Sequence, residues 1–236
     1  MPRGPPWSLD GTGWATSHSR AVSGLHGMRI FILGATGRTG VELIDLALGR
    51  GHDVTAFVRS PAKITRREKR LTVVKGDPRS VEELSAALPG HEVVLSALGP
   101  SPREAIATHS TLLQECAASA LAALARTGVG RFLVVSSALL FPMGGVLPAF
   151  FRALTRNHLR DLTAMEGMVE SSAVDWTIAR PPRLVHGGDD AYRAQAGALP
   201  PGSTLNAVLS WRALAAFLLD AAESGRYRRE VVGICR

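Results

Sequence analysis

The chain has 236 residues, of which 46% are hydrophobic and 20% are charged, which is the composition of a soluble globular protein with room for one large domain. The net charge of +7 does not indicate a nucleic-acid ligand, because 24 of the 27 basic residues are arginines scattered along the chain without interleaved aromatic residues. Two cysteines exclude a disulfide framework or a Cys-rich metal site, and they fit a reduced, cytoplasmic setting.

The first 27 residues differ from the rest of the chain. They are rich in Gly, Pro and Ser, have no apolar periodicity and lack the apolar core of a secretory signal. We therefore interpret residues 1–27 as a disordered tail or an overlong start assignment, and residues 28–236 as one domain. The apolar, uncharged segment 136–151 carries two prolines and two glycines and is too short for a membrane span, and we expect no membrane partner.

From Met28 onward, short apolar segments alternate with helical patterns. In chain order the sequence predicts a strand at 29–34, a helix at 38–51, strands at 53–59 and 71–77, a helix at 80–90, a strand at 92–99, a helix at 103–128, a strand at 131–137, a helix at 159–172, a strand at 175–182, a helix at 210–224 and a strand at 229–234. Apolar strands in such alternation indicate a parallel sheet buried on both faces. The predicted class is therefore α/β, a doubly wound parallel sheet with the strand order 3-2-1-4-5-6.

The turn after the first strand, "GATGRTG", carries three glycines with the spacing GxxGxxG. A dinucleotide's pyrophosphate binds at this point of such a sheet, where the unpaired N–H groups of a helix N-terminus meet it. Gly34 would allow the tight turn, Gly37 the approach of a phosphate, and Gly40 close packing of the helix on the strand. The alternative is a purely structural turn.

The second strand ends at Arg59, where a carboxylate would favour NAD by binding the adenosine ribose. Because Arg59 is a cation and Ser60 and Lys63 follow it, the sequence favours NADP(H), with NAD(H) possible. The alternative is a solvated arginine on an ordinary loop.

With these residues in view, the chain resembles the atypical short-chain dehydrogenase/reductases, and within them the NmrA-like group that includes flavin reductase (biliverdin reductase B). The resemblance covers about residues 28–235 and rests on "GATGRTG", "FVRSPAK", "VVKGD", "VLSALG", "VVSSALLF" and "DWTIARPPRL", in that order. It implies a single Rossmann-type domain with small C-terminal elements on the substrate side.

The resemblance also implies roles for individual residues. The pyrophosphate would be lined by Gly34, Thr36, Gly37, Arg38 and Thr39, and Arg59 would meet the 2′-phosphate. Asp77 would lie near the adenine, and Ala97, Leu98 and Gly99 under the adenosine half. At the nicotinamide the implied residues are Ser136 and Ser137, the catalytic candidates, together with Pro181 and Pro182. One departure is Arg183, which stands where flavin reductase has a histidine, so that histidine's proton-relay role does not carry over; His186 is a weak substitute.

The sequence lacks the Tyr-x-x-x-Lys pair with which the larger short-chain family moves a proton to or from a substrate alcohol. Its two tyrosines, Tyr192 and Tyr227, have no lysine after them. We see no zinc-spaced His/Cys cluster and no GxSxG motif either. The sequence therefore favours hydride transfer that needs little acid–base catalysis by the protein. A flavin or a quinone is a suitable acceptor for such a reaction.

The apolar loop 139–151 follows the fifth strand, at the edge where ligands of such folds bind. Its large side chains either form a wall for a flat ring or cover the sheet or a subunit contact; the candidates are Leu140, Phe141, Met143, Phe150 and Phe151, and Phe141, Met143 and Arg183 are the expected substrate contacts.

Two functions stay open. The first is an NAD(P)H-dependent reductase of a small planar acceptor, and the second is a non-catalytic NADP(H)-binding redox regulator. The sequence does not predict the oligomeric state.

Overall fold

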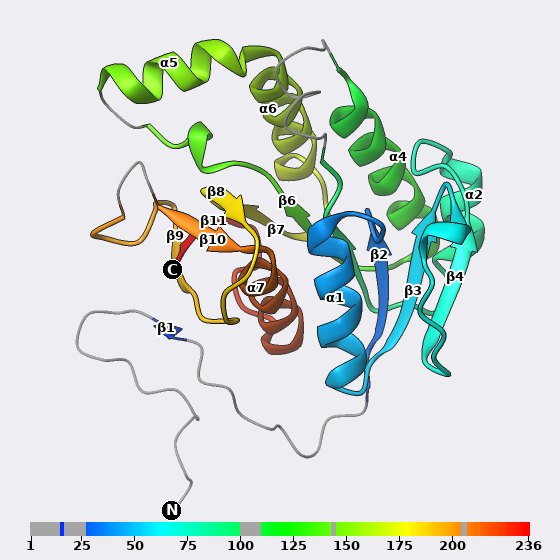
Figure 1. The fold of residues 1–236 in the computed structure, drawn as a ribbon. Helices are drawn as coiled ribbons and strands as arrows, with labels where there is room; N and C mark the ends of the chain where they lie inside the picture. The colour runs from blue at the N-terminus through cyan, green and yellow to red at the C-terminus, as the bar shows by residue number, and fades with distance from the viewer. Residues whose placement is uncertain (1–14, 17–26, 100–109, 143–144, 204–206) are drawn as a thin grey trace, which may run out of the picture.

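The computed structural model describes residues 15–16, 27–99, 110–142, 145–203 and 207–236 (Figure 1). Within them the strands are β1 (Ala15–Thr16), β2 (Arg29–Leu33), β3 (Asp53–Val58), β4 (Leu71–Lys75), β5 (Val93–Ser96), β6 (Arg131–Val135), β7 (Asp175–Arg180), β8 (Arg183–Val185), β9 (Arg193–Ala196), β10 (Val208–Ser210) and β11 (Glu230–Cys235). The helices are α1 (Arg38–Gly49), α2 (Val81–Ala87), α4 (Leu112–Thr127), α5 (Val146–Leu154), α6 (Arg156–Glu170) and α7 (Trp211–Ser224), and the 3-10 turns are η1 (Pro61–Lys63) and η2 (Ala138–Leu140).

Nine of the described strands form one sheet in the order β1-β9-β11-β7-β6-β5-β2-β3-β4. The run β4-β3-β2-β5-β6-β7 is the predicted order 3-2-1-4-5-6, and all neighbours from β4 to β11 are parallel. This confirms the doubly wound α/β sheet. Two features were not predicted. The strand β9 pairs antiparallel with β11, and β8 and β10 form a separate two-stranded parallel sheet.

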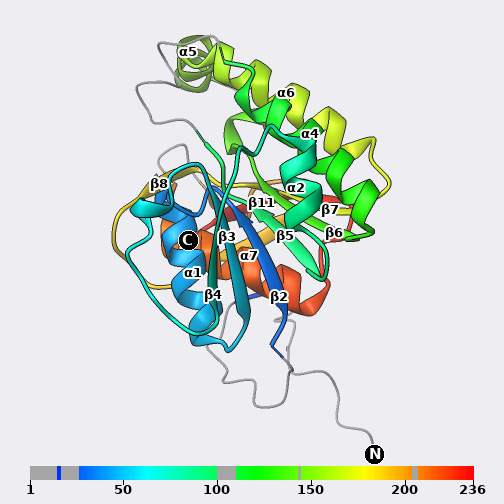
Figure 2. The ribbon, with the colours of Figure 1, turned by 90° about the vertical axis from the view of Figure 1, so that its right-hand side faces the viewer.

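Helices cover both faces of the sheet (Figures 1 and 2). On one face α1 and α7 pack together over a core that includes Leu43 and Phe217. On the other, α2, α4 and α6 pack over a core that includes Phe132 and Trp176. Because both faces are covered, the central strands are almost wholly apolar and buried, and ligands of such sheets bind at the carboxyl ends of the strands.

Polar side chains cap the N-termini of three helices. The Ser80 hydroxyl accepts a hydrogen bond from Glu83 N at the start of α2, and Ser210 Oγ accepts one from Ala213 N at the start of α7. The N-terminus of α4 is capped from a distance, since both carboxylate oxygens of Asp161 on α6 accept its backbone N–H groups. The predicted start of that helix at residue 103 lies outside the described residues, and the described helix begins at Leu112.

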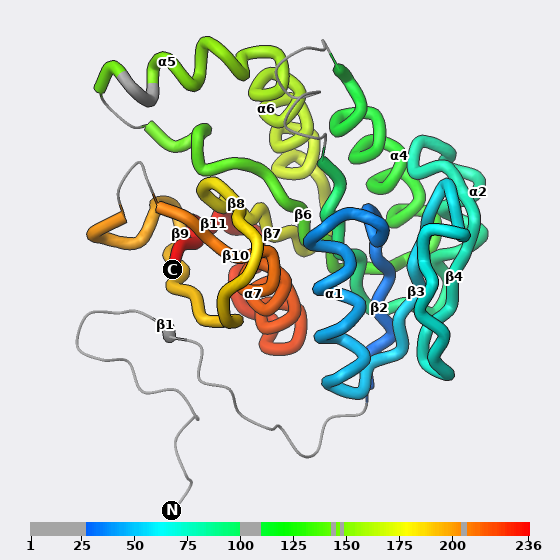
Figure 3. Tube along the Cα trace, in the orientation of Figure 1, coloured from blue at the N-terminus to red at the C-terminus, as the bar shows by residue number. Residues whose placement is uncertain are grey.

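The apolar segment 139–151 is not the continuous loop that we expected. After η2 the chain forms the nine-residue helix α5, from Val146 to Leu154. Pro148 lies in the first turn of this helix, where its missing N–H costs no hydrogen bond, so two prolines and two glycines did not prevent helix formation. The Cα trace in Figure 3 shows α5 at the upper margin of the molecule, next to α6.

Most of the segment 1–27 lies outside the described residues, and Ala15–Thr16 pair with β9. The folded pattern opens at Met28, whose N–H donates to His52 Nδ1, while His52 Nε2 contacts Glu223. We predict that a chain starting at Met28 keeps its melting temperature and cofactor affinity, because its amine still donates to His52 and the strand pairing lost among the described residues is that of Ala15–Thr16. Differential scanning calorimetry and a cofactor titration test this; a large loss of either quantity would show that the removed segment packs on the domain.

Candidate cofactor and active site

The glycine turn joins β2 to α1 at the carboxyl edge of the sheet. Gly34 has φ +79°, and a side chain there would bring its Cβ to 2.6 Å from the carbonyl oxygen of Ala97. A Cβ at Gly40 would overlap the Gly34 carbonyl oxygen and the backbone of Ala35. These two glycines are therefore required by the packing of the turn itself against β5 and the first turn of α1.

Gly37 differs from the other two glycines of the turn. Its backbone, at φ −78° and ψ 169°, is in the extended region that any residue adopts, and its N–H donates to Gly34 O at 2.9 Å. A Cβ would come within 3.2 Å of Gly34 O and is otherwise nearly free of close neighbours. No side chain of the described residues caps α1, and no acidic residue lies in its first turn, so the N–H groups at its start and the positive end of its dipole suit an anion.

The other residues expected at the pyrophosphate lie around this helix start. Thr36 and Arg38 are exposed and Thr39 is buried. The Arg38 guanidinium lies over the ring of Trp211, 4.5 Å from its centroid, and His186 meets the same ring edge-on at 5.6 Å. Sequence reasoning missed Trp211, although its place directly after the capping Ser210 puts it at the same edge of the sheet.

Arg59, Asp77 and Arg79 gather at the ends of β3 and β4. The Arg79 guanidinium binds the Asp77 carboxylate through two of its nitrogens: Nε donates to Oδ1, and Nη2 lies 2.8 Å from Oδ2. The hydrogen bonds from Arg79 hold the pKa of Asp77 below its usual range, and the charge of Arg59 adds to the effect. Arg59 is exposed and forms no ion pair with another described residue. Arg79 neutralises Asp77, and a second carboxylate, Glu83, accepts a hydrogen bond from Asp77 N at 2.8 Å, so Arg59 is the cation of this corner that has no ion pair among the described residues.

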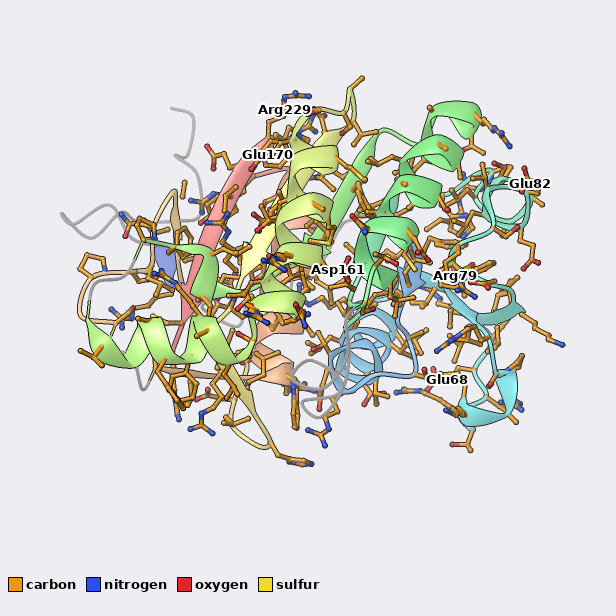
Figure 4. All side chains as sticks on the ribbon, turned by 90° about the horizontal axis from the view of Figure 1, so that it is seen from above. Glu68, Arg79, Glu82, Asp161, Glu170 and Arg229 are labelled. Carbon is orange, nitrogen blue, oxygen red and sulfur yellow. The ribbon has the colours of Figure 1, made fainter. Side chains whose placement is uncertain are left out.

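Figure 4, viewed from above, shows Arg79 near α4, while Glu68 lies on the side of α1. The contacts agree with this view. The Ser119 hydroxyl on α4 donates to Arg79 O, and Arg66, which pairs with Glu68, also pairs with Asp45 on α1. The sequence did not indicate Arg79, whose role depends on its pairing with Asp77.

Ser136 and Ser137 follow the end of β6. Ser136 N donates to Ala179 O at 2.7 Å, and the fully buried Ser136 Oγ has no hydrogen-bond partner among the described residues. The half-buried Ser137 accepts from Leu139 N at 3.3 Å through Oγ, which leaves its O–H free to donate. Since buried hydroxyls are normally paired, the orphaned Ser136 Oγ is a position where a ligand's polar group would fit.

The end of β7 is fixed by a buried ion pair. Arg180 binds Glu166 on α6 through two hydrogen bonds, of 3.0 and 2.5 Å, and its guanidinium lies 4.7 Å from the centroid of the Phe141 ring. The next residue, Pro181, accepts at its carbonyl from Ala138 N at 2.9 Å. This hydrogen bond holds the proline pair and the serine turn side by side, and their role at a nicotinamide, which the resemblance implies, stays a prediction.

The expected substrate contacts are dispersed. Phe141 is 5% exposed and packed under Arg180, Arg183 is exposed at the start of β8, and Met143 lies outside the described residues. Phe150 and Phe151 are exposed on α5, 59% and 43% respectively. A substrate role for Phe141, Met143 and Arg183 stays a prediction.

The two tyrosines are engaged elsewhere. Tyr192 donates to Asp220 Oδ2 at 2.6 Å, and burial raises its pKa; burial also raises the pKa of Tyr227. Both phenols hold their protons more tightly than a free tyrosine does, so neither resembles the lowered-pKa tyrosine of a Tyr-x-x-x-Lys pair.

The comparisons with known proteins agree with this geometry. The model of the NAD(P)H-binding family matches residues 34–224, from the first glycine of the turn to the end of α7. The chain belongs to this family. The match confirms the resemblance to the atypical short-chain dehydrogenase/reductases of NmrA-like type, and it supports a nicotinamide dinucleotide as the cofactor.

One relative matches part of the chain in sequence, and two solved structures match its fold. A chloroplastic protein of Arabidopsis thaliana is 30% identical over 162 residues, which are 65% of this chain and 58% of the relative's length. A short-chain dehydrogenase/reductase from Veillonella parvula, solved with NADP, has a TM-score of 0.71 and 22% identity over 89% of this chain and 94% of that one. The anaerobilin reductase ChuY from Escherichia coli O157:H7 has a TM-score of 0.67 and 19% identity over 88% and 96%.

The residues at the carboxyl edge fit a dinucleotide in three separate ways. The space beside Gly37 is clear, the N–H groups of α1 lack a side-chain cap, and Ser136 Oγ lacks a partner in the described structure. Phosphate oxygens suit the first two features and a carboxamide suits the third. No described helix is long and apolar enough to cross a bilayer.

Proposed function

We propose that the protein is an NADPH-dependent reductase that transfers hydride to a small planar acceptor such as a flavin or quinone. The observation that carries the proposal is the pair of serines at the end of β6, where one buried hydroxyl is unpaired and the other can donate. The reductase ChuY, named for a bilin, a flat conjugated molecule, supports the acceptor class.

The residues have distinct tasks in this reaction. The N-terminus of α1 and the space at Gly37 hold the pyrophosphate, and Ser136 Oγ together with Pro181 orients the nicotinamide carboxamide. Bound NADPH supplies a hydride, and water supplies the proton that completes reduction of the acceptor. Ser137, whose O–H is free, donates a hydrogen bond to the acceptor. No tyrosine–lysine pair takes part.

Steady-state NADPH oxidation with a panel of flavins and quinones tests the proposal. We expect turnover with at least one planar acceptor and none with simple ketones or secondary alcohols, since these need a positioned proton donor. Tight NADP(H) binding without turnover on any acceptor would instead support the non-catalytic redox regulator.

Substitution of the two serines separates positioning from proton transfer. We expect Ser137→Ala to lower kcat by less than the ~10²–10⁴-fold that a general acid contributes, because water supplies the proton. A loss within that range would place Ser137 on an obligatory proton path. The comparison is Ser136→Ala, which removes a hydroxyl that has no hydrogen-bond partner among the described residues; it should weaken NADPH binding and leave the melting temperature unchanged or higher.

A further inference from the structure

Helix α5 presents an apolar face to solvent. Of the six large hydrophobic side chains that are most exposed in the described part of the chain, four lie on α5: Val146 at 89%, Phe150 at 59%, Phe151 at 43% and Leu154 at 42%. Val146, Phe150 and Leu154 are spaced four residues apart and form one stripe, with Phe151 beside it. We call these four residues the α5 apolar face. Figures 1 and 2 both place the helix at the upper margin of the molecule.

The polar side of α5 turns inward. Arg152 projects from the side opposite the stripe and donates hydrogen bonds to the carbonyl oxygens of Leu139 and Phe141. These bonds fix the rotation of the helix about its axis, so that the apolar face stays outward. An ordinary surface helix has the reverse arrangement, and a contiguous exposed apolar patch marks an interaction surface.

The surroundings of the α5 apolar face are cationic. The sequence contains no Asp or Glu between Glu115 and Asp161. The helix is followed directly by Arg156 and Arg160 on α6, which are exposed and form no ion pair with a described residue. Phenylalanine, leucine and valine on one side with arginines at the border are the composition of a helix that lies in the interface of an anionic bilayer.

We propose that the α5 apolar face, with Arg156 and Arg160, docks the protein on an anionic lipid surface. The apolar side chains enter the headgroup boundary and the two guanidinium groups bind lipid phosphates. This contact is peripheral and requires no helix that spans the membrane. The sequence analysis expected no membrane partner, but it did so only because no segment was long enough to span a bilayer. The proposal does not depend on the hydride-transfer reaction.

A second copy of the chain fits the same face less well. A nine-residue helix is about 14 Å long and offers much less than the ~800 Å² per partner of a stable protein–protein interface. In a two-fold contact the same patch faces itself, so the arginines of both copies would approach one another in a protein that already carries a net charge of +7. An anionic bilayer instead neutralises these charges.

Vesicle co-sedimentation of the full chain tests the proposal. We expect binding to phosphatidylcholine vesicles that contain phosphatidylglycerol, weaker binding as salt is raised, and little binding to phosphatidylcholine alone. The variant Phe150→Ser/Phe151→Ser should lose at least about tenfold in affinity. Each of Arg156→Glu and Arg160→Glu should lose at least about fivefold.

Two matched controls carry the same chemical changes on other surfaces. Met168→Ser removes an exposed apolar side chain from the far end of α6, and Arg126→Glu reverses an exposed charge on α4; both should bind within about twofold of wild type. Melting temperatures establish that the variants are folded. If the double phenylalanine variant does not fold, Val146→Asp, at the most exposed position of the face, replaces it.

Three results would overturn the proposal. The first is equal or absent binding of wild type to the two kinds of vesicle, and the second is an equal loss in the control variants. The third is a concentration-dependent dimer in analytical ultracentrifugation that the phenylalanine variant dissociates, because the face would then be an interface between copies.

Discussion

The variant Gly37→Val is expected to weaken NADPH binding by at least about 100-fold and to stay folded. Gly37 lies in an extended conformation that valine adopts readily, and its Cβ would meet only Gly34 O closely, at 3.2 Å, so a shift of a few tenths of an ångström accommodates it in the protein. The added side chain occupies the space in front of the α1 N–H groups. Loss of two charge-assisted bonds to phosphate, of about 1.5–3 kcal/mol each, gives the expected factor.

Gly40→Ala is the matched control for this variant. Alanine has the higher helix propensity, by about 1 kcal/mol, so on local grounds this change would stabilise α1. Its Cβ would instead overlap the Gly34 carbonyl oxygen and the Ala35 backbone. We therefore expect a lower melting temperature for Gly40→Ala and a nearly unchanged one for Gly37→Val. Calorimetric titration of the folded Gly37→Val variant with NADPH measures its affinity. An affinity equal to that of wild type would mean that this turn does not bind the phosphates.

The sequence predicted the central sheet because its signals are local and the connection rules are few. Apolar runs such as 93–96 identify buried parallel strands, and right-handed crossovers then determine their order. The same order places the residues after β2, β5, β6 and β7 at one edge. The glycine turn was singled out from its place between the first strand and helix, whereas the serine pair and the proline pair came from the resemblance, and their roles at a cofactor stay predictions. The antiparallel strand β9 was not predicted, because it has only four residues, 193–196, and these include Arg and Gln.

The remaining parts of the site depend on contacts between residues that are far apart in the sequence. Arg38 lies over Trp211 and Arg180 binds Glu166, and neither pairing has a spacing that a sequence pattern could recognise. The helix α5 was missed for a local reason, since Pro148 and the preceding glycines are typical of a loop. Only its position after the fifth strand indicated that it borders the ligand edge.

Arg59→Glu is expected to weaken NADPH binding much more than NADH binding. Arg59 directly follows β3, where the adenosine ribose of a bound dinucleotide lies in this fold, and no carboxylate stands at that position. Its guanidinium forms no ion pair with the described residues, so it is available for a 2′-phosphate. Two carboxylates lie in the same corner: Arg79 binds Asp77 through two nitrogens, and Glu83 accepts a hydrogen bond from Asp77 N.

A single hydrogen bond between charged groups contributes about 1.5–3 kcal/mol, which corresponds to roughly 10- to 150-fold in affinity. NADH lacks the 2′-phosphate and cannot use this contact, so its affinity should change little, and repulsion by the new carboxylate could invert the preference. The control is Lys69→Glu, which reverses an exposed charge in the same basic loop without a strand-end position. Dissociation constants of both cofactors for the three proteins, at one fixed salt concentration, measure the effect. Two results would contradict the prediction: Arg59→Glu changes the NADPH/NADH affinity ratio by less than about twofold, or Lys69→Glu changes that ratio equally. Either result would mean that Arg59 is a solvated surface residue and that the preference for NADP(H) has another cause.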